Sequence, residues 1–180
     1  MDNEALLNEL KVFISKKHFP KMCLMEPVRE YAPLSESERK QQLEDLGVTP
    51  DKSLLKEYEL YMQSYKRPSF RETLFDMIDK KGMKDADIYR RAGIDRRLFS
   101  KIRSDETYQT SKRTIFSLII AMRLTENEAE NLLESAGFSF SMSHNFDLII
   151  LFFVRKAIYD IDLVNYALLE HQLQPLGCIE

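Results

Sequence analysis

Six basic side chains stand close together on both sides of Gly93, in the stretch DIYRRAGIDRRLFSKIR. They are Arg90, Arg91, Arg96, Arg97, Lys101 and Arg103. The planar fork of arginine matches the two acceptors on the major-groove edge of guanine, and both arginine and lysine bind phosphates. The chemistry that these residue types and this spacing indicate is therefore the recognition of nucleic acid.

The elements that must position these cations are two short helices joined by a glycine corner. Gly93 can adopt a positive φ without steric cost, which a tight corner between helices needs. Asp95 can cap a second helix, on which Phe99 and Ile102 repeat at helical spacing. A helix, a tight turn and a second, basic helix form the helix-turn-helix arrangement, in which the second helix enters the DNA major groove.

The exposed positions of the second helix would meet base edges, and the cations around it would hold phosphates. For base reading we select Arg96, Arg97, Ser100 and Lys101. For phosphate contacts we select Arg90, Arg91, Arg103, Lys112 and Arg113. The last two lie in the first turn of a helix that begins after Ser111, where the helix dipole disfavours cations and nearby phosphates would relieve the conflict. Leu98 would touch a thymine methyl group or, alternatively, form the centre of a protein contact.

The segment GIDRRLFSKI, residues 93–102, resembles the turn and recognition helix of helix-turn-helix proteins of the Cro and lambda-repressor type. The resemblance runs from about Phe70 to Gly137, where the spacing of five successive helices also fits, and it implies a five-helix DNA-binding domain. More particularly, IDRRLFSKIRS with a terminal QPLG is similar to an uncharacterised bacterial module that is often attached to unrelated effector domains. That likeness implies a bacterial protein with a regulatory or recruiting role.

The distribution of proline and glycine predicts an all-α protein. No proline lies between Ser69 and Gln174, and each of the five glycines follows a stretch with helical periodicity, as expected at helix ends. We expect an N-terminal helical segment at residues 1–68, a five-helix helix-turn-helix domain at 69–137 and a C-terminal helical pair at 138–180. The pair contains an apolar run, residues 148–154, and should form an extra layer on the domain or a dimer interface.

The N-terminal segment adds surfaces of its own. Residues 3–17 have an amphipathic pattern, residues 18–34 form a proline-containing arm, and a helix follows that begins at the capping box of Ser35 and Glu38. The next helix places three tyrosines on one face, namely Tyr58, Tyr61 and Tyr65. Such a stripe can stack on bases, but it is more often core or a protein interface, because tyrosine buries a large ring while its hydroxyl stays wet.

Charge is distributed unevenly along the chain. The net charge is -3, yet residues 66–123 contain 15 Lys and Arg against 8 Asp and Glu, whereas the remaining residues contain 11 against 21. A basic segment between acidic flanks is the electrostatic pattern expected of a local nucleic-acid contact surface. The alternative is a basic face that is merely solvated.

Other classes of function find little support in the sequence. Cys23 and Cys178 are far apart, so we expect two reduced thiols in a cytoplasmic protein, and acidic residues stand where a signal peptide would be basic. The longest apolar run is too short to span a membrane. No metal-binding, phosphate-loop or hydrolase motif occurs, and we expect no enzyme, no metal and no cofactor.

Two functions remain. The leading hypothesis is a cytoplasmic, sequence-specific transcriptional regulator that binds double-stranded DNA as a homodimer, since such domains usually pair to read two half-sites. The alternative is a non-enzymatic adaptor that keeps the helix-turn-helix fold and uses its basic face or its tyrosine helix to bind a protein. Asp85, Tyr89 and Leu98 favour the adaptor, because the repressor type usually has a glutamine, a small residue and a polar residue there; the arginines around Gly93 favour DNA.

Overall fold

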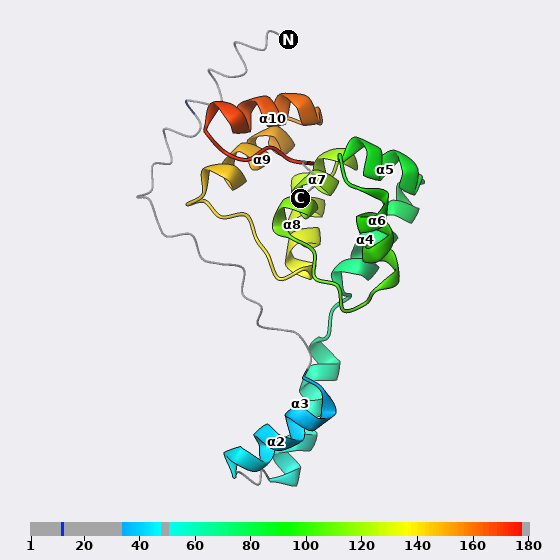
Figure 1. Ribbon diagram of the computed structural model, residues 1–180, viewed down its shortest axis with the longest axis vertical. Helices are drawn as coiled ribbons and strands as arrows, with labels where there is room; N and C mark the ends of the chain where they lie inside the picture. The colour runs from blue at the N-terminus through cyan, green and yellow to red at the C-terminus, as the bar shows by residue number, and fades with distance from the viewer. Residues whose placement is uncertain (1–11, 13–33, 48–50, 178–180) are drawn as a thin grey trace. The chain divides into compact units, whose positions relative to one another are not determined.

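The computed structural model describes residue 12, residues 34–47 and residues 51–177, and within this part of the chain the regular secondary structure is helical, without a strand (Figure 1). The all-α prediction is confirmed to that extent. The helices are α2 (Glu36–Leu46), α3 (Lys52–Tyr65), α4 (Phe70–Lys80), α5 (Asp85–Arg91), α6 (Arg96–Ser104), α7 (Lys112–Ala121), α8 (Glu126–Ser135), α9 (Asn145–Arg155) and α10 (Ile161–Glu170). Apart from Val12 and Leu34, the helix expected at residues 3–17 and the arm at 18–34 lie outside the described residues, as do both cysteines.

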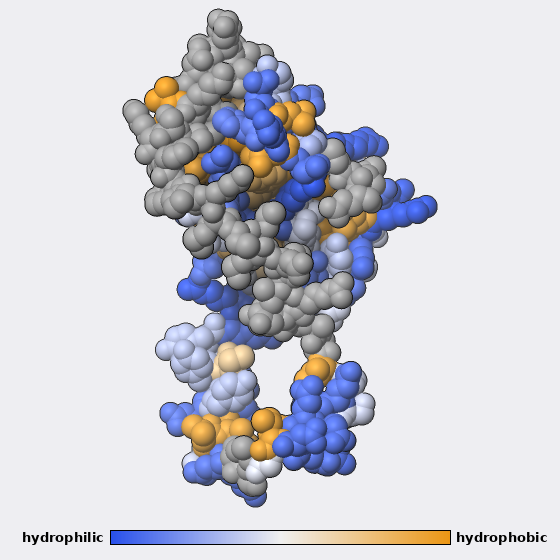
Figure 2. Space-filling model, turned by 60° about the vertical axis from the view of Figure 1, so that its left-hand side comes forward, coloured by the Kyte–Doolittle hydropathy of each residue, from blue (hydrophilic) through white to orange (hydrophobic). Residues whose placement is uncertain are grey.

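The chain divides into two compact units, with a boundary between Arg67 and Pro68. In the smaller unit, α2 begins at the predicted capping box of Ser35 and Glu38 and ends at Gly47, whose φ is 59°. Neither α2 nor α3 contains a buried residue. Hydrophobic side chains therefore interrupt the hydrophilic surface of this unit (Figure 2).

The larger unit contains α4 to α10 around one hydrophobic core. In it, α7 and α8 lie in the middle, with α4, α5 and α6 on one side and α9 and α10 on the other (Figure 1). Capping boxes start α4 and α8, at Ser69 with Glu72 and at Thr125 with Glu128. These boxes satisfy backbone N–H groups that the first helical turn would otherwise leave without partners.

The C-terminal helices belong to this same core. Eight consecutive residues of α9, from Asp147 to Val154, are buried, as the all-round apolar pattern predicted. On α10, Val164, Ala167 and Leu168 are buried where this helix packs against α9 and α7. The pair therefore packs on α7 and α8 within the same unit.

Beyond α10 the chain returns to the corner between α5 and α6. Leu176 is 2% exposed, and the side-chain amide of Asn165 both accepts its N–H (2.6 Å) and donates to its carbonyl oxygen (3.2 Å). Gly177 then packs directly on Gly93, since a Cβ added at Gly177 would lie 2.8 Å from the Ala92 carbonyl oxygen. The chain at 175–177 therefore completes the surface beside the α5–α6 corner.

Candidate nucleic-acid interface

The corner at Gly93 is built by local backbone bonds. The N–H of Ile94 donates to the Tyr89 carbonyl (2.9 Å) and the N–H of Gly93 donates to the Arg90 carbonyl (3.2 Å), with Gly93 at φ 62°. This pattern is the Schellman motif, which ends a helix at a residue with positive φ. The glycine that the sequence placed at the corner thus takes the conformation expected of it.

One face of α6 is anchored and the opposite face is exposed. Asp95 accepts the N–H of Arg97 (2.5 Å) and starts the helix, and Phe99 and Ile102 are 3% and 2% exposed. The Phe99 ring lies 6.0 Å from that of Phe75 in an edge-on arrangement. The four residues selected for base reading, Arg96, Arg97, Ser100 and Lys101, are all exposed.

Four arginines around the corner keep their charge available. Arg90 and Arg91 are exposed in the last turn of α5, where the helix dipole favours cations. Arg96 and Arg97 are exposed in the first turn of α6. Among the residues that the structure describes, no ion pair involves any of these four side chains.

Two further cations of α6 contact neighbouring side chains. Arg103 pairs with Asp85 (2.7 Å) and lies over the Phe75 ring at 4.1 Å, which ties the end of α6 to the start of α5. Lys101 lies over the Tyr108 ring at 4.4 Å. Both side chains remain exposed, and because they are two residues apart on α6 they project from different sides of the helix.

Lys112 and Arg113, the other two residues selected for phosphate contacts, bind groups of this chain. The Lys112 ammonium pairs with Asp147, a carboxylate of α9 that is 4% exposed and also accepts the N–H of Ser141 (2.6 Å). Arg113 donates from two nitrogens to the Pro175 carbonyl oxygen. Asp147 thus supplies, from within the chain, the negative charge that the first turn of α7 requires.

Sequence reasoning missed Asp147 as the partner of Lys112. The available signal was a single carboxylate inside the apolar run NFDLIILFFV, because a buried charge needs a cation or a hydrogen-bond donor. The periodicity placed the helix correctly but could not name the partner.

The loop that follows α6 is stabilised by two hydrogen bonds to the carboxylate of Asp105, a residue of the same loop. The hydroxyl of Thr107 donates to Asp105 (2.7 Å) and its backbone N–H donates to the same oxygen (3.0 Å). These bonds hold the pKa of Asp105 below its usual value, so the carboxylate is ionised at neutral pH. The loop therefore leaves α6 in a defined direction toward α7.

The remaining candidate contacts lie in different places. Leu98 is half-buried and lines a cavity between α6 and α7, rather than standing fully in solvent. Tyr58, Tyr61 and Tyr65 belong to the smaller unit, are 57%, 60% and 69% exposed, and include one ring pair at 4.5 Å, between Tyr61 and Tyr65. Within the described residues these tyrosines are not core.

A scan against models of protein families found no match, and searches of curated proteins and of solved structures likewise found none. The described residues contain no cluster of three or more His, Cys, Asp or Glu side chains that could hold a metal ion. No helix among them has the length and apolar character that crossing a membrane requires.

Proposed function

We propose that this protein is a sequence-specific DNA-binding regulator of transcription, in which α5 and α6 act as a helix-turn-helix and α6 reads the major groove. The observation that carries the proposal is the exposed face of α6, where Arg96, Arg97, Ser100 and Lys101 stand opposite the buried side chains of the same helix. A short helix held from behind, with cations on its free side, suits insertion into a groove.

The contacts divide into two kinds. Arg97 and Lys101 lie one turn apart on α6 and are suited to base edges, with Arg96 and Ser100 beside them. Arg90 and Arg91, at the end of α5, are suited to phosphates, which orient the protein without reading sequence. Arg103 can add a phosphate contact, since its side chain is 51% exposed even while it pairs with Asp85.

The regulator acts as a homodimer in this proposal, because a single α6 covers too few base pairs for a specific site. Two copies would present their α6 helices about 34 Å apart, which is one turn of the duplex. The exposed apolar face of α3 provides a self-association surface, and it includes Leu54, Leu55, Tyr58, Tyr61, Met62 and Tyr65.

The test is selection of bound duplexes from a random pool, followed by fluorescence anisotropy with the selected sequence. We expect a two-fold symmetric site, and binding that the double variant R96A/R97A loses while Lys80→Ala retains it. Lys80 is a matched control because it is an exposed cation, on α4, that already pairs with Asp76. An absence of duplex binding even at low salt would refute the proposal.

A protein-binding adaptor is the second candidate, and the exposure of α3 favours it. Tyr58, Tyr61 and Tyr65 are accessible in a helix with no buried residue, and tyrosine is enriched where proteins meet. If the protein is an adaptor, the Y58S/Y61S/Y65S variant loses binding to the protein partner, whereas R96A/R97A retains that binding. If the protein is instead the DNA-binding regulator, R96A/R97A loses duplex binding, and Y58S/Y61S/Y65S weakens it as well, because α3 joins the two copies in that proposal.

A further inference from the structure

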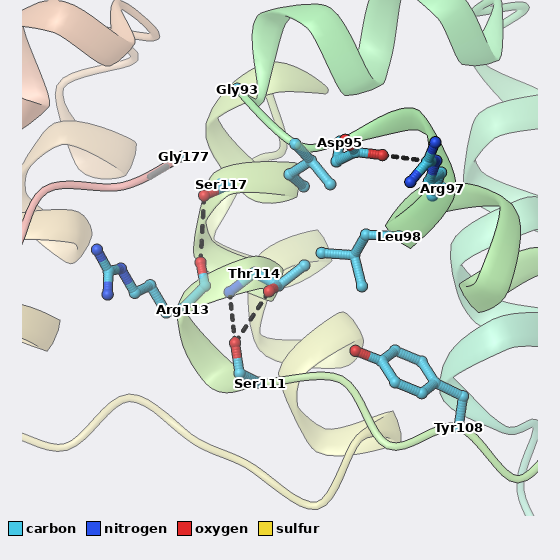
Figure 3. A pocket seen from close by; sticks show the side chains of 11 residues that line it. Gly93, Asp95, Arg97, Leu98, Tyr108, Ser111, Arg113, Thr114, Ser117 and Gly177 are labelled. Atoms are coloured by element: carbon cyan, nitrogen blue, oxygen red, sulfur yellow. Dashed lines mark hydrogen bonds between the residues drawn. The ribbon is translucent and has the colours of Figure 1, made fainter. Parts of the chain in front are cut away.

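A cavity of about 460 Å³ lies between the start of α6, the start of α7 and Gly177 (Figure 3). Its volume falls within the range of small-molecule sites in proteins. All its lining residues belong to the larger unit, and none of the contacts described above assigns it a role.

The cavity has an apolar side. Ile94 is 9% exposed and follows directly on the glycine corner, while Leu98 is half-buried in the first turn of α6. Figure 3 shows the Leu98 side chain directed toward Thr114 of α7. An apolar side chain on the front half of α6 is thereby turned into the cavity, where it can contact the body of a ligand.

The cavity also has two polar groups with which no described residue forms a hydrogen bond or an ion pair. Among the described residues, the Tyr108 hydroxyl has no hydrogen-bond partner, and Figure 3 shows it pointing toward Leu98 and Thr114. The Arg97 guanidinium likewise has no ion pair there. Both groups can donate hydrogen bonds to an anion.

The other polar groups of the lining already have partners. Ser111 and Thr114 share a hydrogen bond between their hydroxyls (2.9 Å), and Ser117 donates to the Arg113 carbonyl (3.3 Å). The one carboxylate of the lining, Asp95, caps α6 by accepting the N–H of Arg97. The donors left over are thus a cation and a phenol, which selects a negatively charged ligand.

We infer that this cavity binds a small organic carboxylate with an apolar body. In Figure 3 the Arg97 side chain lies beside Asp95, with Leu98 between it and Tyr108. Because this side chain is exposed, it can turn toward the cavity, where its fork, which matches two oxygens, and the Tyr108 hydroxyl would hold the carboxylate. The apolar body would lie on Ile94 and Leu98. A carboxylate held in this way occupies Arg97, so its binding lowers the affinity for duplex DNA; this second statement rests on the proposed function.

The experiment titrates the full chain with hexanoate, cyclohexylacetate and 3-phenylpropionate and follows the methyl signals of Ile94 and Leu98 by NMR. We expect saturable shifts of these methyls for at least one carboxylate, with the Leu133 methyls of the core unchanged. The matching alcohols should bind at least about tenfold more weakly, because they lack the charge that Arg97 would pair with.

Three variants test whether Tyr108 and Arg97 contribute to carboxylate binding. Tyr108→Phe keeps the ring under Lys101 and removes only the hydroxyl, and we expect about tenfold weaker carboxylate binding, as for Arg97→Ala. Lys80→Ala should bind like the wild type. An absence of shifts with all three carboxylates, or equal affinities in Y108F, R97A and the wild type, would overturn the inference.

Duplex competition distinguishes this inference from the proposed function. In the wild type the carboxylate should weaken duplex binding, and in Y108F the duplex should bind normally while competition needs about tenfold more carboxylate. Carboxylate binding without any duplex binding would leave the cavity assignment standing and refute the regulator. Duplex binding without carboxylate binding would leave the regulator standing and refute the cavity assignment.

Discussion

The carboxylate of Asp147 lies within a helix that is otherwise buried and apolar, and its partners are the ammonium of Lys112 and the N–H of Ser141. The pair connects the start of α7 to the start of α9. It also explains why a lysine can stand in the first turn of α7, where the unpaired N–H groups make the local potential positive. The contact is structural, and it takes Lys112 out of the set of cations with free charge.

We expect Asp147→Ala to lower the free energy of unfolding by about 3 kcal/mol, because it leaves a partly buried ammonium without its partner beside a helix N-terminus. The double variant K112M/D147L should recover most of that loss, since it also removes the uncompensated ammonium. Urea unfolding followed by circular dichroism measures both. Asp76→Ala, which breaks the exposed pair with Lys80, is the control and should cost below about 1 kcal/mol; an equal cost at both positions would contradict this account.

Arg97 has the opposite character, since its side chain is exposed and contributes no ion pair to the described part of the fold. Arg97→Ala should therefore leave the unfolding free energy within about 0.5 kcal/mol of the wild type. On the selected duplex it should cost about 1 to 3 kcal/mol and relax specificity at one base position. Anisotropy titrations against single-base variants of the site give the answer, and a uniform loss across all sequences would make Arg97 a phosphate contact instead.

At the scale of elements, the α5–α6 corner is held from outside as well as from within. The Schellman bonds close it locally, and the segment after α10 packs Gly177 on Gly93. Arg113 and Asn165 hold that segment by hydrogen bonds to Pro175 and Leu176. The segment after α10 thus packs on the corner that precedes α6, so we expect a change in this segment to affect the position of α6.

Gly177→Ala should destabilise the fold by about 2 to 3 kcal/mol, because the residue has φ 68° and its new Cβ would lie 2.8 Å from the Ala92 carbonyl oxygen. Gly137→Ala is the matched control. Gly137 has φ 76° with nothing within 4 Å of an added Cβ, so that variant reports backbone strain alone, about 1 kcal/mol. Thermal unfolding of both variants is the measurement, and equal effects would show that the close approach of the two glycines contributes nothing.

Elements with local causes could be predicted from the sequence, and contacts between distant residues could not. The capping boxes at Ser35 and Thr125, the corner at Gly93 and the buried run of α9 all follow from residues within a few positions of each other. The partner of Lys112 is 35 residues away, and Gly177 meets Gly93 only because α9 and α10 fold back across α7. The periodicity of a helix does not indicate which distant residue it will contact. For the same reason, the tyrosine stripe of α3 predicted either core or an interface, and the sequence could not decide between the two.

At the scale of the whole molecule, the basic segment at residues 66–123 contains cations in two different states. Lys112 and Arg103 are neutralised by Asp147 and Asp85, whereas Arg90, Arg91, Arg96 and Arg97 form no ion pair within the described residues. A count of charges along the sequence treats all of them alike. Cations without a partner can neutralise phosphates, and so release counterions from the duplex, without giving up an existing ion pair.

The salt dependence of duplex binding tests this distinction. For a dimer, Arg90→Ala should reduce the slope of log affinity against log salt by about 2, since each phosphate contact contributes roughly 0.9 and two copies are lost. K112M/D147L removes a lysine and its carboxylate together, so it should leave the slope unchanged although the basic segment has lost a cation. Anisotropy titrations between about 50 and 200 mM salt resolve such a difference. A slope that falls in K112M/D147L and not in R90A would place the phosphate contacts at the start of α7, and the exposed arginines of the corner would then have another role.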